Sequence, residues 1–305
     1  MDDARVRTAA FAWLEQQQRL RGEVLPAELL RGGCTLDGER IPLMGPSGIW
    51  KPRVLQNLPL SITTTWGSRY QDRVGENDSF IYSFRDGDHV QNDYLRRAAR
   101  QGTPLIYFHA VAHARYQALF PVFIVQVEES AREIQVQVGD TRIPFAYAGL
   151  GIGQAVAGVA EGRADLFKSY RTVEAKVRVH QQVFRERVLT AYHRSCACCG
   201  FRHDELLDAA HIIEDRHELG KPLVPNGLAL CSLHHRAFDR HFIGINADCR
   251  VHVRPDLMEE KDGPTLEGIQ NLQGKLLRVR PRHVADQPDR DALDHRFQQF
   301  LAACG

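Results

Sequence analysis

The chain has 305 residues, of which 43% are hydrophobic and 25% charged, and its formal net charge is +1. This length favours two domains with cores of their own, and the composition is ordinary for a soluble globular protein. The near-neutral charge excludes a uniformly basic protein, and without a spanning stretch or signal-peptide pattern we expect a cytoplasmic protein with no membrane anchor.

Residues 1–140 are expected to form one mixed α+β domain. Short helices are predicted near residues 7–18 and 26–32, and Asp37-Gly38 is typical of a hairpin turn. A further helix, 92–102, lies among the predicted strands and ends at Gly102. The strands are expected at 60–66, 80–85, 104–112, 120–128 and 133–139. This order of elements favours a strongly curved sheet or barrel.

Residues 141–170 are expected to be a linker, and a long helix is predicted over about 172–193. Eight Lys or Arg stand against three Asp or Glu between Arg163 and Arg194, so this region is locally basic. The tail predicts a strand at 275–281 and a helix at 289–303. A second basic run in the tail consists of Lys275, Arg278, Arg280 and Arg282. A solvated face and a contact with nucleic acid both remain open for each run.

Cysteine spacing indicates a metal site. Seven cysteines, an odd number, argue against a framework of disulfides. Cys196 and Cys199 form one C-x-x-C pair, and Cys231 and His234 form a second pair of the same spacing. Four such ligands suit a structural, tetrahedral zinc ion. The alternative is four independent reduced side chains, and Cys198 is expected to be outside the site.

The adjacent histidines His234 and His235 point about 100° apart on a helix, so one site cannot easily use both. His235 and Asp239 are four residues apart and share a helical face, where they could bind one divalent metal ion. The alternative is a surface hydrogen bond between them. His211 stands at the end of an apolar, strand-like run, and the turn residues that follow lead to Asn226.

The segment "CACCGFRHDELLDAAHIIEDRHELGKPLVPNGLALCSLHHRAFDR" resembles the HNH nucleases of the ββα-metal class. The resemblance implies that His211 is the general base that activates water, and that Asn226 holds the loop and positions that histidine. It also implies that His235 and Asp239 bind the catalytic Mg²⁺ or Mn²⁺. The nuclease domain is expected at 171–305, with its core motif at 195–253.

One position departs from the family pattern. Many relatives carry Asp or His immediately before the base as a further metal ligand, and this chain has Ala210 there. Two alternatives follow: Asp208 substitutes as a further ligand of the catalytic metal, or the metal relies on two side chains.

Basic residues near the motif are expected to contact the phosphate backbone of double-stranded DNA, which positions the duplex without reading its sequence. They lie on the long helix and on the helix of His235. The predicted DNA-binding residues are Lys176, Arg178, Arg185, Arg187, Arg236 and Arg240.

Segments of residues 1–140, such as "GIWKPRVLQNLPLSITT" and "PLIYFHAVAHARYQALFPVFIV", resemble the SRA/PUA-like leading domain of bacterial HNH restriction-type endonucleases. The resemblance implies a domain that grips a flipped, modified base between aromatic and polar side chains. The alternative is that the aromatic residues fill the core. The candidate pocket residues are Trp50, Tyr70, Asp72, Tyr82, Phe108 and His109.

The expected fold is thus α+β, with a curved, SRA/PUA-like β-barrel domain, a linker, a long basic helix and a zinc-stapled ββα-metal domain. The expected function is a metal-dependent DNA endonuclease, a modification-dependent, type IV-like restriction enzyme that acts on DNA with modified cytosine. Two alternatives remain: a DNA-binding or sensing protein with a structural or weakly active HNH module, and an RNA nuclease. A homodimer also remains open.

Overall fold

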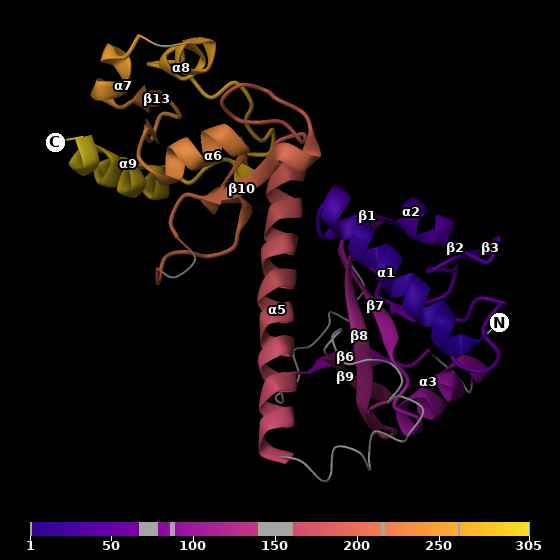
Figure 1. The fold of residues 1–305 in the computed structure, drawn as a ribbon. Helices are drawn as coiled ribbons and strands as arrows, with labels where there is room; N and C mark the ends of the chain where they lie inside the picture. Colours follow the sequence, from indigo (N-terminus) through magenta and orange to yellow (C-terminus); the bar gives the residue numbers. More distant parts are fainter. Residues whose placement is uncertain are drawn as a thin grey trace. The chain divides into compact units, whose positions relative to one another are not determined.

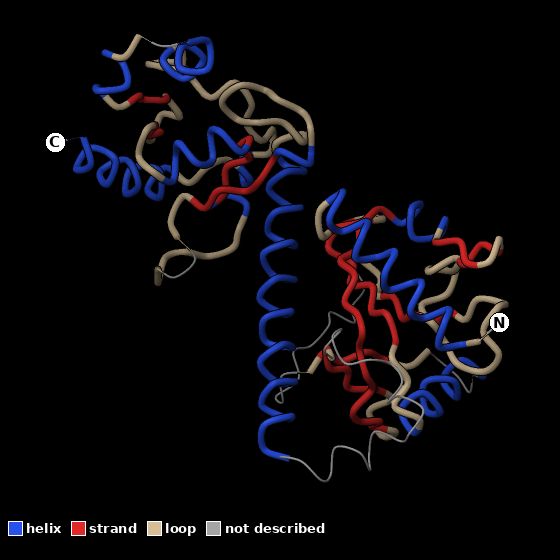
Figure 2. Tube along the Cα trace, viewed as in Figure 1, coloured by secondary structure: helices blue, strands red, loops and turns tan. Residues whose placement is uncertain are grey.

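The computed structural model describes residues 2–66, 79–85, 89–139, 161–214, 217–261 and 263–304, with the helical backbone alone for residues 161–173. The chain divides into two compact units, Met1–Gln182 and Val183–Gly305. The division falls within the long helix α5, Glu161–Ala191. Each unit contains helices and strands (Figure 1, Figure 2), as the predicted α+β class requires.

Helix α1, Asp3–Arg21, covers one face of the sheet in the N-terminal unit. The side chain of Asp2 accepts a hydrogen bond from a backbone N–H of the first turn, and Gly22, with φ of 85°, ends the helix. Leu14 of this helix belongs to the same buried cluster as Phe108 of the sheet. The helix and the sheet therefore share one hydrophobic core.

The main sheet has seven strands in the order β4-β5-β7-β8-β9-β6, with β1 paired to β8. Strands β5 and β7 pair in parallel, and the other pairs of the described strands are antiparallel. The strands are β1 (Val24–Pro26), β4 (Ile49–Trp50), β5 (Ser61–Thr63), β6 (Phe80–Ser83), β7 (Leu105–Ala112), β8 (Arg115–Glu128) and β9 (Glu133–Val138).

Strand β8 curls this sheet. Opposite β7, its first residues pair with β1 and its later residues pair with β9. The register shifts in both the β7–β8 and the β8–β9 pairs, and such bulges bend strands. Among the described strands, β4 and β6 are the two ends of the path and do not pair with each other. The described strands therefore form a curled half-barrel and not the closed barrel that was one expectation.

Smaller elements complete the N-terminal unit: α2 (Ala27–Gly32), β2 (Cys34–Leu36), β3 (Glu39–Ile41) and α3 (Val90–Arg100). The predicted turn is confirmed, because Leu36 pairs with Glu39 and both Asp37 and Gly38 have positive φ, 51° and 82°. These angles fit a two-residue hairpin turn. Helix α3 begins two residues before its predicted start and stops before Gly102, whose φ is 57°.

The predicted linker and the observed helix overlap. Helix α5 begins at Glu161, so residues 161–170 are helical where a linker was expected, and residues 141–160 lie outside the described part. From residue 163 onwards the segment contains no glycine or proline, and nothing local interrupts a helix there. The linker was predicted too long because the residues before 163 are rich in glycine, whereas the residues from 163 onwards are not.

The C-terminal unit consists of the end of α5, a ββα arrangement and further helices and strands packed around one core. Its elements are β10 (Leu207–His211), β11 (Gly227–Cys231), α6 (Ser232–Asp239), β12 (Ile243–Ile245), β13 (Val251–Val253), α7 (Pro255–Glu259), α8 (Gly263–Gln270) and α9 (Arg290–Cys304), with short 3-10 turns at Asp204–Leu206, Val224–Asn226 and Val284–Asp286. The predicted C-terminal helix corresponds to α9.

The strand predicted at 275–281 is wrong, because this segment forms a single isolated bridge, Leu276 to Arg250. Its backbone N–H groups bond instead to two loops: Leu277 donates to Cys249, and Arg278 donates to Ala197. Polar and apolar residues alternate in this segment as in a strand, but beyond the one bridge it pairs with no neighbouring strand of the described part of the chain.

Across the described residues, no helix is long and apolar enough to span a bilayer.

Candidate metal centre and nuclease site

Four side chains converge in the C-terminal unit: Cys196, Cys199, Cys231 and His234. Their ligand atoms all lie within 4.8 Å of one another. Nδ1 of His234 lies 3.4 Å from Sγ of Cys196 and 3.2 Å from Sγ of Cys231. A tetrahedral zinc ion, with Zn–S distances of about 2.3 Å and Zn–N distances of about 2.0 Å, requires its nitrogen and sulfur ligand atoms to lie about 3.5–3.8 Å apart. The donor set and its spacing therefore fit a closed metal site, and Cys198 is not one of the four.

The backbone places the first pair of these ligands. The N–H of Gly200 donates to the carbonyl of Cys196 at 2.8 Å, and the N–H of Cys196 donates to the carbonyl of Phe201 at 2.9 Å. Gly200 has φ of 76°, which closes this tight turn. The N–H of Ala197 donates to Ala229 of β11 at 2.7 Å, which fastens the turn to the strand that ends in Cys231.

The close approach of the four side chains shifts their pKa values. Burial lowers the pKa of His234, but its contacts with Cys196 and Cys231 outweigh burial and raise that pKa to about 9. Contacts with the other thiols lower the pKa of Cys196, and the contact with Cys196 raises that of Cys199. Three sulfurs so close together cannot all ionise without positive charge among them, and a bound metal ion supplies such charge.

The predicted base, His211, is the last residue of β10. It pairs in register with Gly227, the first residue of β11. The ring of Phe184, from α5, stacks on the imidazole with centroids 4.1 Å apart and an interplanar angle of 15°. A Cβ at Gly227 would lie 2.4 Å from Val188 and 3.0 Å from Phe184, so glycine permits this close packing. Helix α5 and the hairpin together hold the imidazole.

Asn226 clamps the chain just beyond His211. Its Oδ1 accepts a hydrogen bond from the N–H of Ile213 at 2.9 Å, and its Nδ2 donates to the carbonyls of Ile213 at 2.9 Å and Lys221 at 3.1 Å. The backbone carbonyl of Asn226 accepts from Ile212 at 2.9 Å. Asn226 is buried, so water does not compete for these bonds. This geometry suits the positioning role that the resemblance implies.

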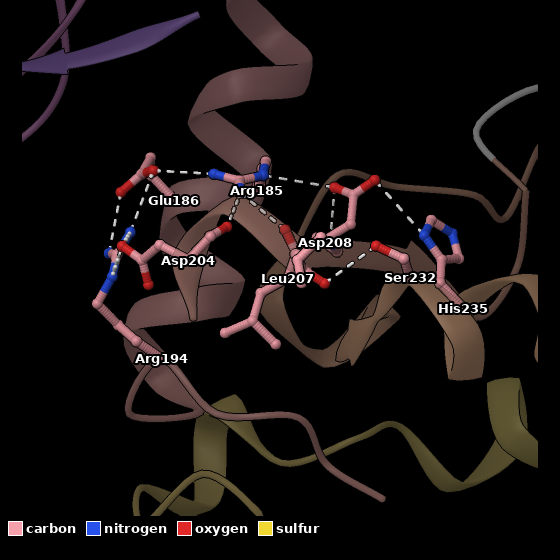
Figure 3. Close-up of polar contacts among 10 residues, drawn as sticks. Arg185, Glu186, Arg194, Asp204, Leu207, Asp208, Ser232 and His235 are labelled. Atoms are coloured by element: carbon pink, nitrogen blue, oxygen red, sulfur yellow. Dashed lines mark hydrogen bonds and ion pairs between the residues drawn. The ribbon is translucent and has the colours of Figure 1, made fainter. Parts of the chain in front are cut away.

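His235 lies between two carboxylates. Its Nδ1 is 3.5 Å from Oδ2 of Asp208, and its Nε2 is 3.4 Å from Oδ2 of Asp239. Figure 3 shows Asp208 between the imidazole of His235 and the guanidinium of Arg185. The contact with Asp208 raises the pKa of His235 although burial opposes the shift. The imidazole is therefore in an environment that favours positive charge.

Asp208 is held on its other side as well. Its Oδ1 accepts a hydrogen bond from the N–H of Ala209 at 2.8 Å and lies 3.5 Å from Nε of Arg185. Burial raises the pKa of Asp208, but His235, the Ala209 N–H and Arg185 outweigh it and lower that pKa overall. Asp208 is thus an ionised and oriented carboxylate.

The two carboxylates address opposite nitrogens of the same ring, and therefore Asp208, His235 and Asp239 do not converge on a single point. A divalent ion could bind between Nε2 of His235 and the carboxylate of Asp239, or between Nδ1 of His235 and the carboxylate of Asp208. Asp208 is also bonded to Ala209 and Arg185, which leaves Asp239 as the less committed carboxylate.

Helix α5 is joined to this site by a buried ionic network (Figure 3). Arg185 donates to the carbonyls of Asp204 at 2.9 Å and Leu207 at 2.7 Å. Glu186, which is fully buried, pairs with Arg185 at 3.2 Å and with Arg194 at 3.1 Å. The network attaches the helix to the start of β10. Arg185 is therefore a structural residue here, which corrects its assignment to DNA binding.

The remaining predicted DNA-binding residues differ in exposure. Lys176 is only 7% exposed, and its Nζ lies 6.0 Å from the ring centroid of Phe80, so it is not placed to reach a phosphate. Its position on the helix turns it toward the sheet of the N-terminal unit, which the basic composition did not reveal. Arg178 is exposed and lies 3.7 Å from Glu23. The other three, which are all exposed, are Arg187, Arg236 and Arg240.

The candidate base-pocket residues do not form one pocket. Phe108 is fully buried in the core beneath α1, whereas Tyr82 and His109 pack against Tyr107, with ring centroids 6.5 and 6.0 Å apart. Phe108 and His109 are adjacent on β7, and adjacent side chains leave opposite faces of a strand. Assigning both to one pocket was therefore wrong. The indole of Trp50 donates to the carbonyl of Pro42, and Tyr70 and Asp72 lie outside the described residues.

Comparison with known proteins bears on this site. Residues 196–246 match the family model described as HNH endonuclease. The matched segment contains the four-residue cluster, the β10–β11 hairpin and α6, so the chain carries an HNH endonuclease domain and is a nuclease. Among solved structures, the chain is similar to a modification-dependent TagI restriction endonuclease, with 19% identity, coverage of 80% of this chain and 82% of that chain, and a TM-score of 0.31. No curated protein matches it significantly.

Sequence reasoning missed two residues that support the site. Phe184 of α5, whose ring stacks on His211, was not among the predicted site residues. Arg296 of α9 is 7% exposed, lies 5.1 Å from the ring centroid of Phe238, and approaches the carbonyls of Phe238 and Asp239 at 3.4 and 3.5 Å. Cations favour the last turn of a helix, which here carries Asp239. A signal existed, because Arg296 follows Ala292 and Leu293 at the spacing of a buried helical face.

Proposed function

We propose that the chain is a metal-dependent endonuclease that hydrolyses phosphodiester bonds of DNA, and that it acts as a modification-dependent, type IV-like restriction enzyme. One observation carries the proposal: the β10–β11 hairpin and α6 hold His211, Asn226 and His235 in consecutive elements of an HNH endonuclease segment. The family match favours an enzyme over the alternative of a protein that only binds DNA.

In the proposed reaction, His211 takes a proton from the attacking water, and neutral imidazole suits this role near pH 7. Phe184 and the clamp of Asn226 limit the movement of His211. His235 and Asp239 would hold a divalent ion such as Mg²⁺ or Mn²⁺, which when bound offsets negative charge on the scissile phosphate.

Asp208 is proposed to orient His235 and not to bind the catalytic ion. It faces Nδ1 of His235, and this contact leaves Nε2 directed at Asp239. A carboxylate behind a metal-binding imidazole commonly fixes the ring and its tautomer. The oriented Asp208 thereby offers a structural reason why Ala210 can replace the acidic or histidine ligand of many relatives.

Zinc is the proposed ion of the four-residue cluster, since three thiolates and one imidazole are soft or borderline ligands. The cluster joins the turn after α5 to β11 and α6. A metal ion bound there would stabilise the fold around the nuclease site and take no part in the reaction.

DNA is the proposed partner because exposed arginines flank this site. Arg236 and Arg240 lie on or directly after the helix that carries His235, and Arg187 lies on α5. Two chains with one site each would cut both strands in a single binding event, which keeps a homodimer within the proposal. A cytoplasmic location suits an enzyme that acts on intracellular DNA.

Dependence on a modified base is proposed for the N-terminal unit. Tyr82 and His109 both contact Tyr107 within this unit, but Tyr107 is fully buried and Tyr82 is only 8% exposed, so these rings do not by themselves form an open site for a flipped base. The SRA/PUA-like character of this unit rests on the resemblance of its sequence segments, and its closed-barrel form is not part of the proposal.

Cleavage assays test the proposal. Phage DNAs with differently modified cytosines and an unmodified plasmid are incubated with the protein in Mg²⁺ and in Mn²⁺. We expect cleavage of at least one modified DNA, little cleavage of the plasmid, and no cleavage by His211→Ala. Equal cleavage of all DNAs would refute modification dependence alone. Cleavage by His211→Ala at the wild-type rate would refute the assigned base, and cleavage of RNA in place of DNA would refute the substrate.

A further inference from the structure

The basic run of the C-terminal tail forms an ordered surface. Along residues 277–282, here called the arginine segment, exposure alternates from one residue to the next. Leu277 and Pro281 are buried and Val279 is half-buried. The exposed residues between and after them are Arg278, Arg280 and Arg282. The apolar side chains thus anchor a segment that presents three guanidinium groups to solvent.

This segment is fastened beside the metal cluster. The N–H of Arg278 donates to Ala197 at 2.8 Å, within the turn that carries Cys196 and Cys199. Nη1 of Arg278 donates to the carbonyl of Cys199 at 3.2 Å, and the N–H of Leu277 donates to Cys249 at 2.9 Å. The position of the arginines is therefore set by the same turn that contributes two of the four cluster ligands.

Its positive charge is not compensated by carboxylates. In the described part of the chain, Arg278, Arg280 and Arg282 take part in none of the ion pairs, and residues 268–285 contain no Asp or Glu. Asp248 and Asp289 line the same hollow as Arg280. Both are engaged elsewhere, Asp248 with Arg290 at 2.8 Å and Asp289 with backbone N–H groups of α9 at 2.9 Å.

Some other arginines of this unit are held in ion pairs. Arg194 pairs with Asp204 at 2.6 Å, and Arg254 pairs with Asp256 at 2.6 Å. Paired arginines hold the fold together, whereas a group of exposed and unpaired arginines repels itself in the absence of an anion. Such a group fits a partner with repeated negative charge, and guanidinium groups suit phosphate in particular.

We infer that Arg278, Arg280 and Arg282 form a contact surface for the phosphate backbone of duplex DNA. This inference rests on the proposed function and extends it, because none of these residues belongs to the nuclease motif. The surface binds phosphates without reading bases, and it adds to the affinity that Arg236 and Arg240 provide at the motif itself.

Salt-dependent binding tests the inference. A fluorescein-labelled DNA duplex is titrated with the full chain carrying His211→Ala, which prevents cleavage, over a series of salt concentrations. Log K falls as log salt rises, and removal of each phosphate contact reduces the magnitude of this negative slope by about 0.9. The triple variant Arg278→Gln/Arg280→Gln/Arg282→Gln is expected to reduce the magnitude of the slope by about 2.7.

Two further variants separate binding from folding and from net charge. Arg280→Gln/Arg282→Gln leaves the contact between Arg278 and Cys199 intact and should reduce the magnitude of the slope by about 1.8. Lys261→Gln removes one exposed charge from the same unit and should leave the slope unchanged. Melting temperature and metal content are measured for each variant, and the double variant should keep both.

The outcomes distinguish the inference from the proposal beneath it. If the His211→Ala protein binds DNA with a steep salt dependence and the double and triple variants do the same, the arginine segment is not a DNA contact. If Lys261→Gln, which removes one charge, changed the slope by half as much as Arg280→Gln/Arg282→Gln, which removes two, the effect would be one of general charge and the surface would be refuted. If the parent protein binds RNA duplex but not DNA, the proposed DNA substrate fails along with the inference.

Discussion

Replacing Asn226 tests whether the loop after His211 is held as the hydrogen bonds indicate. Asn226→Ala removes three side-chain bonds, to the N–H and the carbonyl of Ile213 and to the carbonyl of Lys221. Asn226→Asp has the same shape and keeps an acceptor for the N–H of Ile213. It replaces the donor amide with an oxygen that would face two carbonyl oxygens, so it should be no milder than alanine.

The magnitude follows from burial. A hydrogen bond contributes about 1 kcal/mol net, and a buried donor left without a partner costs about 1–3 kcal/mol. Asn226 is 7% exposed and Ile213 is 8% exposed, so water cannot replace the lost bonds without entering the core. We expect Asn226→Ala to lower the free energy of unfolding by about 3 kcal/mol, which corresponds to about 10 °C in melting temperature for a unit of this size.

The assay must report on the C-terminal unit. All three tryptophans lie in the first 66 residues, so tryptophan fluorescence would report on the other unit. Hydrogen exchange of short overlapping peptides within 211–226, read by mass spectrometry, reports on the amide of Ile213 by difference. We expect fast exchange there in both Asn226 variants, and cleavage activity reduced well below wild type at temperatures where the protein is folded.

Asn246 offers a matched control. Its Oδ1 accepts bonds from the backbone N–H groups of Asp248 and Arg250 in a half-buried turn that follows β12, outside β10, β11 and α6. Asn246→Ala should cost about 1 kcal/mol and leave cleavage unchanged. Wild-type exchange at Ile213 in Asn226→Ala would refute the clamp, and so would equal losses of activity in the Asn226 and Asn246 variants.

Two further predictions concern neighbouring positions. His234→Ala should lower zinc content and melting temperature, whereas His235→Ala should keep both and raise the metal concentration needed for cleavage or abolish it; identical melting and metal response in the two variants would refute separate roles. Gly227→Ala should cost about 1–3 kcal/mol, because its Cβ would lie 2.4 Å from Val188. It should also reduce cleavage by displacing Phe184 from the base, and calorimetry with a cleavage assay measures both effects.

Local spacing made the C-terminal site predictable. The four cluster residues form two short pairs, and a C-x-x-C or C-x-x-H spacing dictates that both members turn to one side of a tight turn or helix. The structure brings these four residues together, and the pairing of β10 with β11 follows from the residues that flank the Asn226 turn. Contacts between residues a few positions apart can be predicted from the sequence, because the geometry of the chain alone determines them.

Contacts between distant segments were not readable in this way. The basic composition of α5 suggested DNA contacts throughout, but tertiary packing buries Lys176 and commits Arg185 to carbonyls of Asp204 and Leu207. The link from Arg185 through Asp208 to His235 joins three elements, and no spacing rule connects them. The error at Phe108 has the same origin, because the choice of which strand face lies toward α1 depends on the whole sheet.

The adjacent histidines show how the structural and nuclease sites depend on each other. On α6, His234 is 5% exposed and turned toward Cys196 and Cys231, whereas the half-buried His235 is turned toward carboxylates, as expected for neighbours about 100° apart on a helix. Cys231 ends β11 and α6 starts at the next residue, so a metal ion bound by Cys231 and His234 would fix the first turn of the helix. That turn sets the direction in which His235 points. Loss of the cluster must therefore disturb the nuclease site, whereas loss of His235 leaves the cluster ligands in place, and this asymmetry distinguishes a structural metal from a catalytic one.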